Sequence, residues 1–228
     1  MEIERVSSIQ LPGDQCQRGW YSRGYVPHFD GGPIPQMVTF RLVDSFPSKC
    51  LAEWAVELST MRPDQAECET RRRFEEYLDK GLGSTWLSRP DVADIVSQAL
   101  LRFDGQRYHL HAWTVMPNHV HALLTPRSGE SLSQILHSWK SFTANKANTV
   151  MGRTGTFWQR EYFDRYLRNE EHFAAAIVYI ENNPVKAGLC RTAVEWCYSS
   201  ASYRDAGLKP TGLAVRFDGL GQMSKVKS

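Results

Sequence analysis

The segment Arg107–Thr125 reads RYHLHAWTVMPNHVHALLT, and it decides the fold of the chain. Two runs rich in apolar and aromatic residues, 107–116 and 119–125, are separated only by Pro117-Asn118. Runs of this length and composition are typical of β-strands, and so short a connection joins neighbouring strands. We therefore expect a tight pair of antiparallel strands at the centre of the protein.

The second of these strands places two imidazoles on the same face. Side chains alternate between the faces of a strand, so His119 and His121 point the same way. Neutral imidazoles are lone-pair donors that can share one divalent cation and leave it Lewis acidic. The pair also fits a half-buried polar strand, since His109 and His111 repeat the spacing one strand earlier. The histidines alone therefore leave both interpretations open.

A second motif, Tyr179-Ile180-Glu181-Asn182-Asn183-Pro184, lies about sixty residues later in a predicted helix, 170–183. Tyr179, Asn183 and Lys186 recur at four and three residues, which places them on one helix face. Because a helix usually ends before proline, Pro184 predicts that Asn183 lies at the helix end, where its amide could face a metal.

A tyrosine on this face could act as a nucleophile. A phenol has a pKa near 10 and attacks slowly at neutral pH unless a metal polarises the phosphate. Tyr179 could also be an ordinary half-buried helix residue. Tyr162 and Tyr166 are rival candidates, but neither has an amide or a basic residue at a matching helical offset.

The segment between the motifs, 131–168, is basic and aromatic. Its cations are Lys140, Lys146, Arg153, Arg160, Arg165 and Arg168, against the anions Glu161 and Asp164. Cations neutralise phosphates and aromatic rings stack on unpaired bases, so the mixture suits single-stranded nucleic acid. A solvated basic face over an aromatic core fits equally well, and the net charge of +2 is too mild to decide.

The rest of the chain predicts a single α+β domain. Residues 1–36 are rich in Gly and Pro and are predicted to form an irregular arm. One strand is predicted at 37–43, and 155–168 is predicted to be strand or loop. Helices are predicted at 49–60, 63–80, 88–103 and from Leu132 onward. At 228 residues this order indicates one antiparallel sheet with helices on one face.

The cysteines and the termini indicate a reduced, intracellular protein. The five cysteines are odd in number and none forms a Cys-x-x-Cys pair. No apolar run follows the charged N-terminus, and no segment has the uninterrupted apolar length of a membrane span. We expect a cytoplasmic protein without a membrane partner.

Taken together, the motifs resemble those of a known family. The blocks 116–123, 158–160 and 179–188, with 139–143 between them, resemble the signatures of the REP-associated tyrosine transposases. These belong to the single-tyrosine His-hydrophobic-His (HUH) transposase superfamily. The resemblance covers residues 37–203, which we expect to be the transposase domain, and leaves the arm and the tail, 204–228, unassigned.

The resemblance implies a ferredoxin-like fold of the HUH transposase type and a set of site residues. His119 and His121 would hold a divalent cation, Mg²⁺ or Mn²⁺, with Asn183 as the third ligand. Tyr179 would be the nucleophile, which forms a transient 5′-phosphotyrosine and releases a 3′-hydroxyl. Imidazole ligands suit Mn²⁺ better than Mg²⁺. All four positions are filled, so we expect an active enzyme.

The implied partner is single-stranded or hairpin DNA, cleaved and rejoined next to REP-like hairpin elements in the bacterial nucleoid. The expected DNA contacts are Lys140, Lys146, Arg160, Arg165, Arg168 and Lys186. Two alternatives remain: a structured nucleic-acid-binding protein, domesticated from a transposase, that no longer cuts, and a hydrolase in which water attacks and Tyr179 only orients the substrate. Monomer and homodimer are both open.

Overall fold

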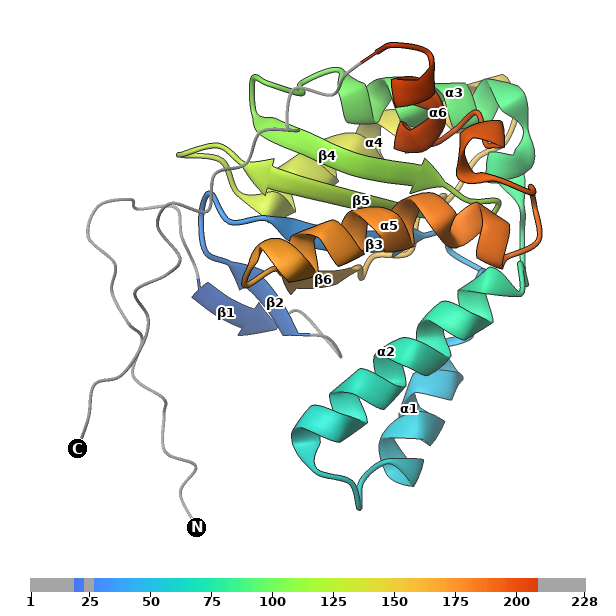
Figure 1. Cartoon of the computed structure of the whole chain (residues 1–228). Coiled ribbons are helices and arrows are strands. Elements are labelled where there is room, and N and C mark those ends of the chain that lie inside the picture. The colour runs from blue at the N-terminus through green and yellow to red at the C-terminus, as the bar shows by residue number, and fades with distance from the viewer. Residues whose placement is uncertain (1–18, 23–26, 209–228) are drawn as a thin grey trace.

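The computed structural model describes residues 19–22 and 27–208. Its centre is a four-stranded antiparallel sheet in the order β4-β5-β3-β6 (Figure 1). The strands are β3 (Gln36–Arg41), β4 (Tyr108–Val115), β5 (His119–Pro126) and β6 (Phe163–Tyr166). β4 and β5 form the hairpin predicted around Pro117-Asn118. The predicted antiparallel α+β architecture is confirmed.

One face of the sheet carries the main hydrophobic core. Val120, Ala122 and Leu124 of β5 lie in this core together with apolar residues of α3 (Pro90–Leu101) and α4 (Leu132–Val150). The helix α4 begins at Leu132 because Ser131 caps it. The Ser131 hydroxyl accepts a hydrogen bond from the Gln134 amide at 3.2 Å. The prediction of helices on one face holds for α3 and α4.

The opposite face carries an additional helix, α5 (Glu170–Lys186), which the sequence did not place there. Ile180 of α5 shares a small apolar cluster with Leu123 of β5. Since neighbouring side chains of a strand point to opposite faces, this is also the face of His119 and His121. The sheet therefore lies between a core layer and a second layer that holds the candidate site.

The helix α5 continues past Pro184, which corrects the predicted end at Asn183. A proline in a helix removes one N–H donor. Here the loss falls in the last turn, where Ala187 N still donates to Asn183 O and Leu189 N to Pro184 O, both at 2.9 Å. Tyr179, Asn183 and Lys186 thus remain on one continuous helix.

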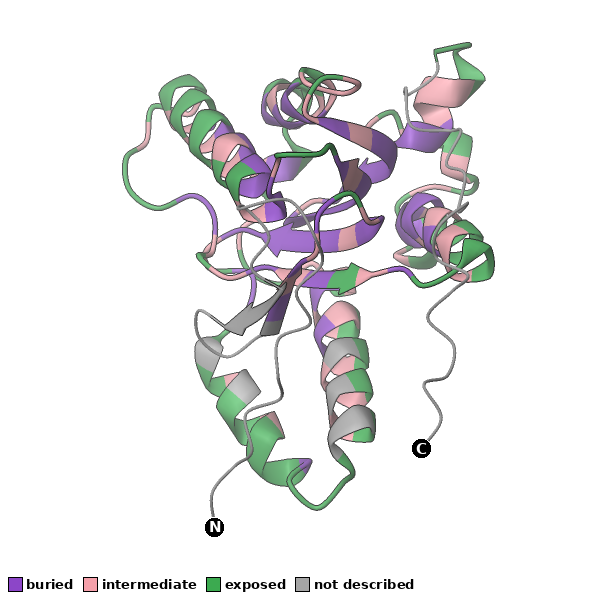
Figure 2. Ribbon diagram, turned by 90° about the vertical axis from the view of Figure 1, so that its left-hand side faces the viewer, coloured by how far each residue is buried: buried purple, intermediate pink, exposed green. Residues whose placement is uncertain are grey.

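A pair of helices, α1 (Ser48–Glu57) and α2 (Pro63–Asp79), forms an arm that extends away from the sheet (Figure 1). Most of the described surface of the arm is exposed or half-buried, in contrast to the sheet (Figure 2). Its base is held by aromatic contacts, because the ring of Phe74 lies 5.0 Å from Phe46 and 4.0 Å from Phe163 of β6. These contacts fix the second half of α2 beside the sheet.

Two short strands precede the sheet. β1 (Gly19–Ser22) pairs with β2 (Pro27–Asp30), so the predicted irregular arm is wrong for these residues. The backbone amide of Phe29 donates to Asp164 Oδ2 at 2.9 Å, and His28 Nδ1 lies 2.5 Å from Asp164 Oδ1. These bonds attach β2 to β6. Residues 1–18, 23–26 and 209–228 lie outside the described residues.

The remaining helical elements are short. They are η1 (Trp86–Ser88), η2 (Ala193–Glu195) and α6 (Ser200–Asp205). Glu181 of α5 accepts hydrogen bonds from Ser200 and Arg204, so this residue of the second motif fixes α6 against α5. Across the described residues, no helix combines the length and the apolar character needed to cross a bilayer.

Candidate active site

The two histidines predicted to bind metal lie side by side on β5. Their Nε2 atoms are 3.1 Å apart, and each residue is only 1% exposed. Two nitrogens that bind one cation at about 2.1 Å and at right angles lie about 3 Å apart. The spacing of the pair therefore fits two ligands of a single ion.

Hydrogen bonds at Nδ1 orient both imidazole rings. His119 Nδ1 lies 2.7 Å from Asn118 Oδ1, while Asn118 Nδ2 donates to the carbonyls of Leu78 and Leu82 at 3.3 and 3.1 Å. Because the amide nitrogen must be the donor, Oδ1 is the acceptor, and the proton of His119 sits on Nδ1. The lone pair of His119 is then on Nε2, where a cation needs it.

The ring of His121 is bonded to a threonine hydroxyl. His121 Nδ1 lies 2.7 Å from Thr39 Oγ1, on the neighbouring strand β3. A hydroxyl can accept from Nδ1 or donate to it. When Thr39 accepts, the lone pair of His121 is also on Nε2, and both lone pairs point into the same space.

Burial keeps both imidazoles neutral. It lowers the pKa of His119 well below its usual value, with a smaller contribution from His121. It lowers the pKa of His121 to about 3, with a smaller contribution from the positive charge of Lys186. A neutral ring is the form that binds a metal.

Tyr179 lies directly beside this pair. Its ring centroid is 5.5 Å from that of His121. The hydroxyl is buried and makes no hydrogen bond of good geometry. Burial first, and then the negative charges of Glu75 and Asp79, raise the pKa of Tyr179 above its usual value. The phenol is thus held protonated until something takes its proton.

Asn183 is the strongest sign that this face of the sheet can hold a ligand. Its side chain is 0% exposed, yet neither its Oδ1 nor its Nδ2 has a hydrogen-bond partner. A buried amide without partners is costly, and a cation would satisfy the oxygen. Two imidazoles and an amide fit a divalent ion, although the described residues hold no group of three His, Cys, Asp or Glu arranged for one.

The chain is similar in sequence to known transposases. Residues 89–183 match the model of the family "Transposase IS200 like". Over 151 residues, 60% of this chain and 87% of the relative, the chain is 28% identical to the REP-associated tyrosine transposase of Escherichia coli (strain K12). The chain is thus similar to the REP-associated tyrosine transposases. This relationship supports transposase activity.

A second relative and a solved structure also match the chain. A protein of the same family name from Haemophilus influenzae (strain ATCC 51907 / DSM 11121 / KW20 / Rd) is 27% identical over 96 residues, 38% of this chain and 54% of its own length. A solved REP-associated tyrosine transposase, bound to a REP hairpin, superposes with a TM-score of 0.52 at 18% identity. It covers 88% of this chain and 97% of its own, and at this identity it shows the fold.

The segment that matches the transposase family contains His119, His121, Tyr179 and Asn183. The rival tyrosines lie elsewhere in the fold: the ring of Tyr162 packs against His28 at 4.2 Å, and that of Tyr166 against Phe29 at 4.8 Å.

The basic residues predicted to contact DNA occupy different environments. Arg165 on β6 is exposed and lines a cavity beside Tyr179. Lys186 bonds Asp79 of α2 at 2.8 Å. Lys140 donates to the carbonyls of Gln159 and Arg160, at 2.7 and 2.8 Å. Of the remaining predicted contacts, Lys146 is exposed on α4, across the sheet from the histidines, and Arg160 and Arg168 are exposed near β6.

Most aromatic rings of the basic segment belong to the core. The buried ones are Trp139, Phe157, Trp158 and Tyr162. Phe142 is exposed, and Phe163 and Tyr166 are half-buried. The alternative of a basic face over an aromatic core is therefore correct for the buried rings.

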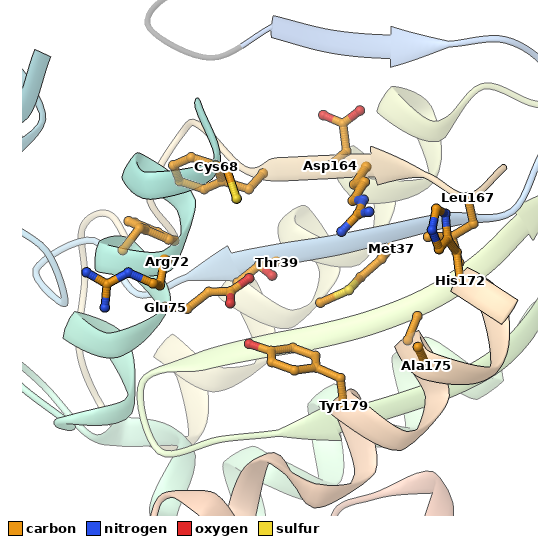
Figure 3. Close-up of a pocket in the computed structure, with 14 residues that line it drawn as sticks. Met37, Thr39, Cys68, Arg72, Glu75, Asp164, Leu167, His172, Ala175 and Tyr179 are labelled. Atoms are coloured by element: carbon orange, nitrogen blue, oxygen red, sulfur yellow. The ribbon is translucent and has the colours of Figure 1, made fainter. Parts of the chain in front are cut away.

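A cavity of about 440 Å³ opens beside the candidate nucleophile (Figure 3). Tyr179 comes to it from α5, Thr39 from β3, Arg165 from β6 and Glu75 from α2. Sequence reasoning missed Glu75, Thr39 and the anchoring role of Asn118. Asn118 lay within the quoted motif, whereas nothing local marks the other two.

Proposed function

We propose that this chain is a metal-dependent single-stranded DNA transposase that cleaves and rejoins DNA through a 5′-phosphotyrosine intermediate. The observation that carries the proposal is the contact between Tyr179 and His121, whose Nε2 lies 3.1 Å from that of His119. A nucleophile, two neutral imidazoles and the unpaired amide of Asn183 thus occupy one face of the sheet. Each of the four has a role in the proposed reaction.

His119, His121 and Asn183 would hold the cation, with Mn²⁺ better suited than Mg²⁺ to imidazole ligands. When bound, a divalent cation polarises the scissile phosphate and stabilises the charge that develops on it. Asn118 and Thr39 keep the two rings in position. Tyr179 attacks phosphorus, the bond to the 3′ oxygen breaks, and the 5′ phosphate stays on the tyrosine.

Rejoining follows from the same residues. A new 3′-hydroxyl attacks the phosphotyrosine, and the Tyr179 oxygen leaves. The phosphodiester bond energy is stored in the covalent intermediate, so the cycle requires no ATP.

The proposed substrate is a single strand flanking a hairpin, as the complex of the related transposase with a REP hairpin suggests. Arg165 is the most direct candidate contact, because it lines the cavity beside Tyr179. Lys146, Arg160, Arg168 and Lys186 remain proposed contacts, and each would add to a salt-dependent affinity. Lys140 would contribute by holding the 159–160 backbone as well as by its charge.

A labelled hairpin with a single-stranded flank, incubated with Mn²⁺ and run on a denaturing gel, tests the proposal. We expect a covalent protein–DNA band that disappears in Tyr179→Phe and in EDTA, and that persists in Tyr166→Phe. Free cleavage without the band would indicate the hydrolase alternative. Binding without cleavage under every metal condition would indicate the protein that no longer cuts.

A further inference from the structure

We propose that Glu75 is a catalytic residue: its carboxylate orients the Tyr179 hydroxyl and accepts its proton when the phenol attacks the scissile phosphate. The inference rests on the proposed function and adds to it the residue that activates the nucleophile. It also gives the arm α1–α2, which lies outside the segment matched by the transposase family, a part in the chemistry.

The placement of Glu75 follows from the helical repeat of α2. Cys68, Arg72, Glu75 and Asp79 are separated by four, three and four residues, so they share one helix face. Three of them line the cavity beside Tyr179, and Asp79 bonds Lys186 of α5 at 2.8 Å. This face of α2 is therefore turned toward α5.

The carboxylate and the phenol face each other within the cavity. The side chains of Glu75 and Tyr179 point toward one another from opposite walls (Figure 3). Glu75 is close enough for its charge to act on the phenol, where it raises the pKa of Tyr179 after the larger effect of burial. The hydroxyl makes no well-formed bond elsewhere, so it can turn toward the carboxylate.

A proton acceptor is needed here, and the neighbouring groups are poorly suited to the role. A phenol is a weak nucleophile until its proton is removed. The Nε2 atoms of His119 and His121 are required as metal ligands. Asp79 is paired with Lys186. Asp164 accepts from the Phe29 amide at 2.9 Å.

The other polar residues of the cavity do not replace Glu75. Arg72 and Arg165 are cations. His172 lies seven residues before Tyr179 on α5, about 10 Å along the helix axis. Thr39 is bonded to His121. Glu75 remains as the carboxylate that faces the nucleophile.

The proposed step balances in atoms and charge. The Tyr179 proton moves to a carboxylate oxygen of Glu75 as the bond between Oη and phosphorus forms. The bond between phosphorus and the 3′ oxygen breaks, and that oxygen takes a proton from water. In rejoining, the incoming 3′-hydroxyl releases its proton to water, and Glu75 returns its proton to the departing phenolate.

The first test compares Glu75→Gln with Glu76→Gln. Glu76 is the adjacent carboxylate; it is exposed, is paired with Arg72 and does not line the cavity. We expect Glu75→Gln to slow single-turnover formation of the covalent complex about 100-fold, as for the loss of a general base, with hairpin affinity changed less than about twofold. Glu76→Gln should form the complex at the rate of the unchanged protein. Equal rates in all three proteins would overturn the inference.

A second measurement separates proton acceptance from a structural role. Replacing Tyr179 by a trifluorotyrosine supplies a more acidic phenol, which needs a base less. The penalty of Glu75→Gln should then shrink at least about tenfold. The same penalty with both phenols would show that Glu75 does not take the proton. A covalent band that survives Tyr179→Phe would instead refute the proposed function itself.

Discussion

Two buried tyrosine hydroxyls, one on each face of the central sheet, are bonded in different ways. On the α3–α4 face, the Trp139 indole donates to Tyr108 Oη at 2.9 Å, and that hydroxyl donates to Leu100 O at 2.8 Å. On the α5 face, the Tyr179 hydroxyl and both amide atoms of Asn183 are buried without partners. Unpaired buried groups lower stability, and a folded protein tolerates them where a ligand will satisfy them. The unpaired groups of Tyr179 and Asn183 are the ones that the proposed reaction uses.

The largest expected effect comes from removing a tyrosine hydroxyl, in separate variants, from each face of the sheet. Tyr179→Phe should abolish covalent-complex formation, by roughly 1,000-fold or more, and change the free energy of unfolding by less than about 0.5 kcal/mol. Tyr108→Phe should do the reverse, because it leaves the Trp139 N–H unpaired, at a cost of about 1–3 kcal/mol. Urea unfolding and the denaturing gel measure the two quantities. A large stability loss in Tyr179→Phe would contradict the comparison.

The next effect concerns Asn118, which orients one of the proposed metal ligands. Asn118→Ala removes the acceptor of His119 Nδ1 and should weaken Mn²⁺ binding 10- to 100-fold, measured by calorimetry. Asn182→Ala is a suitable control, since Asn182 is exposed and only donates to Val178 O at 3.0 Å. If both variants bound Mn²⁺ as the unchanged protein does, Asn118 would have no part in holding the ligand.

The buried histidines also predict how stability depends on pH in EDTA. The pKa of His121 is lowered to about 3 in the folded protein, against 6.5 when exposed. The unfolded chain therefore binds more protons between these values, and the free energy of unfolding falls as the pH drops from about 6.5 toward 3. The loss should be on the order of a few kcal/mol and smaller in His121→Gln. Denaturant unfolding at each pH measures the free energy of unfolding of both proteins. If it fell equally with pH in the unchanged protein and in His121→Gln, the prediction would be wrong.

The smallest effect is a gain in stability. Asn183→Leu replaces an unpaired buried amide by an apolar side chain of similar size, so the metal-free protein should become more stable by about 1 kcal/mol. Its affinity for Mn²⁺ should fall at the same time. Thermal unfolding with and without Mn²⁺ measures both changes. A less stable Asn183→Leu protein in EDTA would show that the amide has a structural partner.

The sequence predicted those parts of the site that depend on the local repeat of one element. The period of two in β5 predicts that His119 and His121 share a face, and their Nε2 separation of 3.1 Å agrees. The period of α5 predicts that Tyr179 and Lys186 lie together, and the Lys186 ammonium is 6.0 Å from the tyrosine ring. The metal, the DNA contacts and the roles of these residues remain predictions.

The sequence could not predict features that depend on how separate elements pack. Glu75 lies about a hundred residues before Tyr179, and only the docking of α2 beside the sheet brings the two into one cavity. The same holds for the pairing of β1 with β2. The continuation of α5 past Pro184 was missed for a different reason: the rule that a helix ends before proline is a tendency, and this helix runs through proline to Lys186.

Asn118 links the end of α2 directly to the ring of His119. Its amide is bonded on one side to the carbonyls of Leu78 and Leu82, at the end of α2, and on the other to the ring of His119. A displacement of that end of α2 must either break these bonds or turn the ring. A movement of the helical pair α1–α2 at this end would therefore change the orientation of the His119 ring, and with it the geometry of the candidate site.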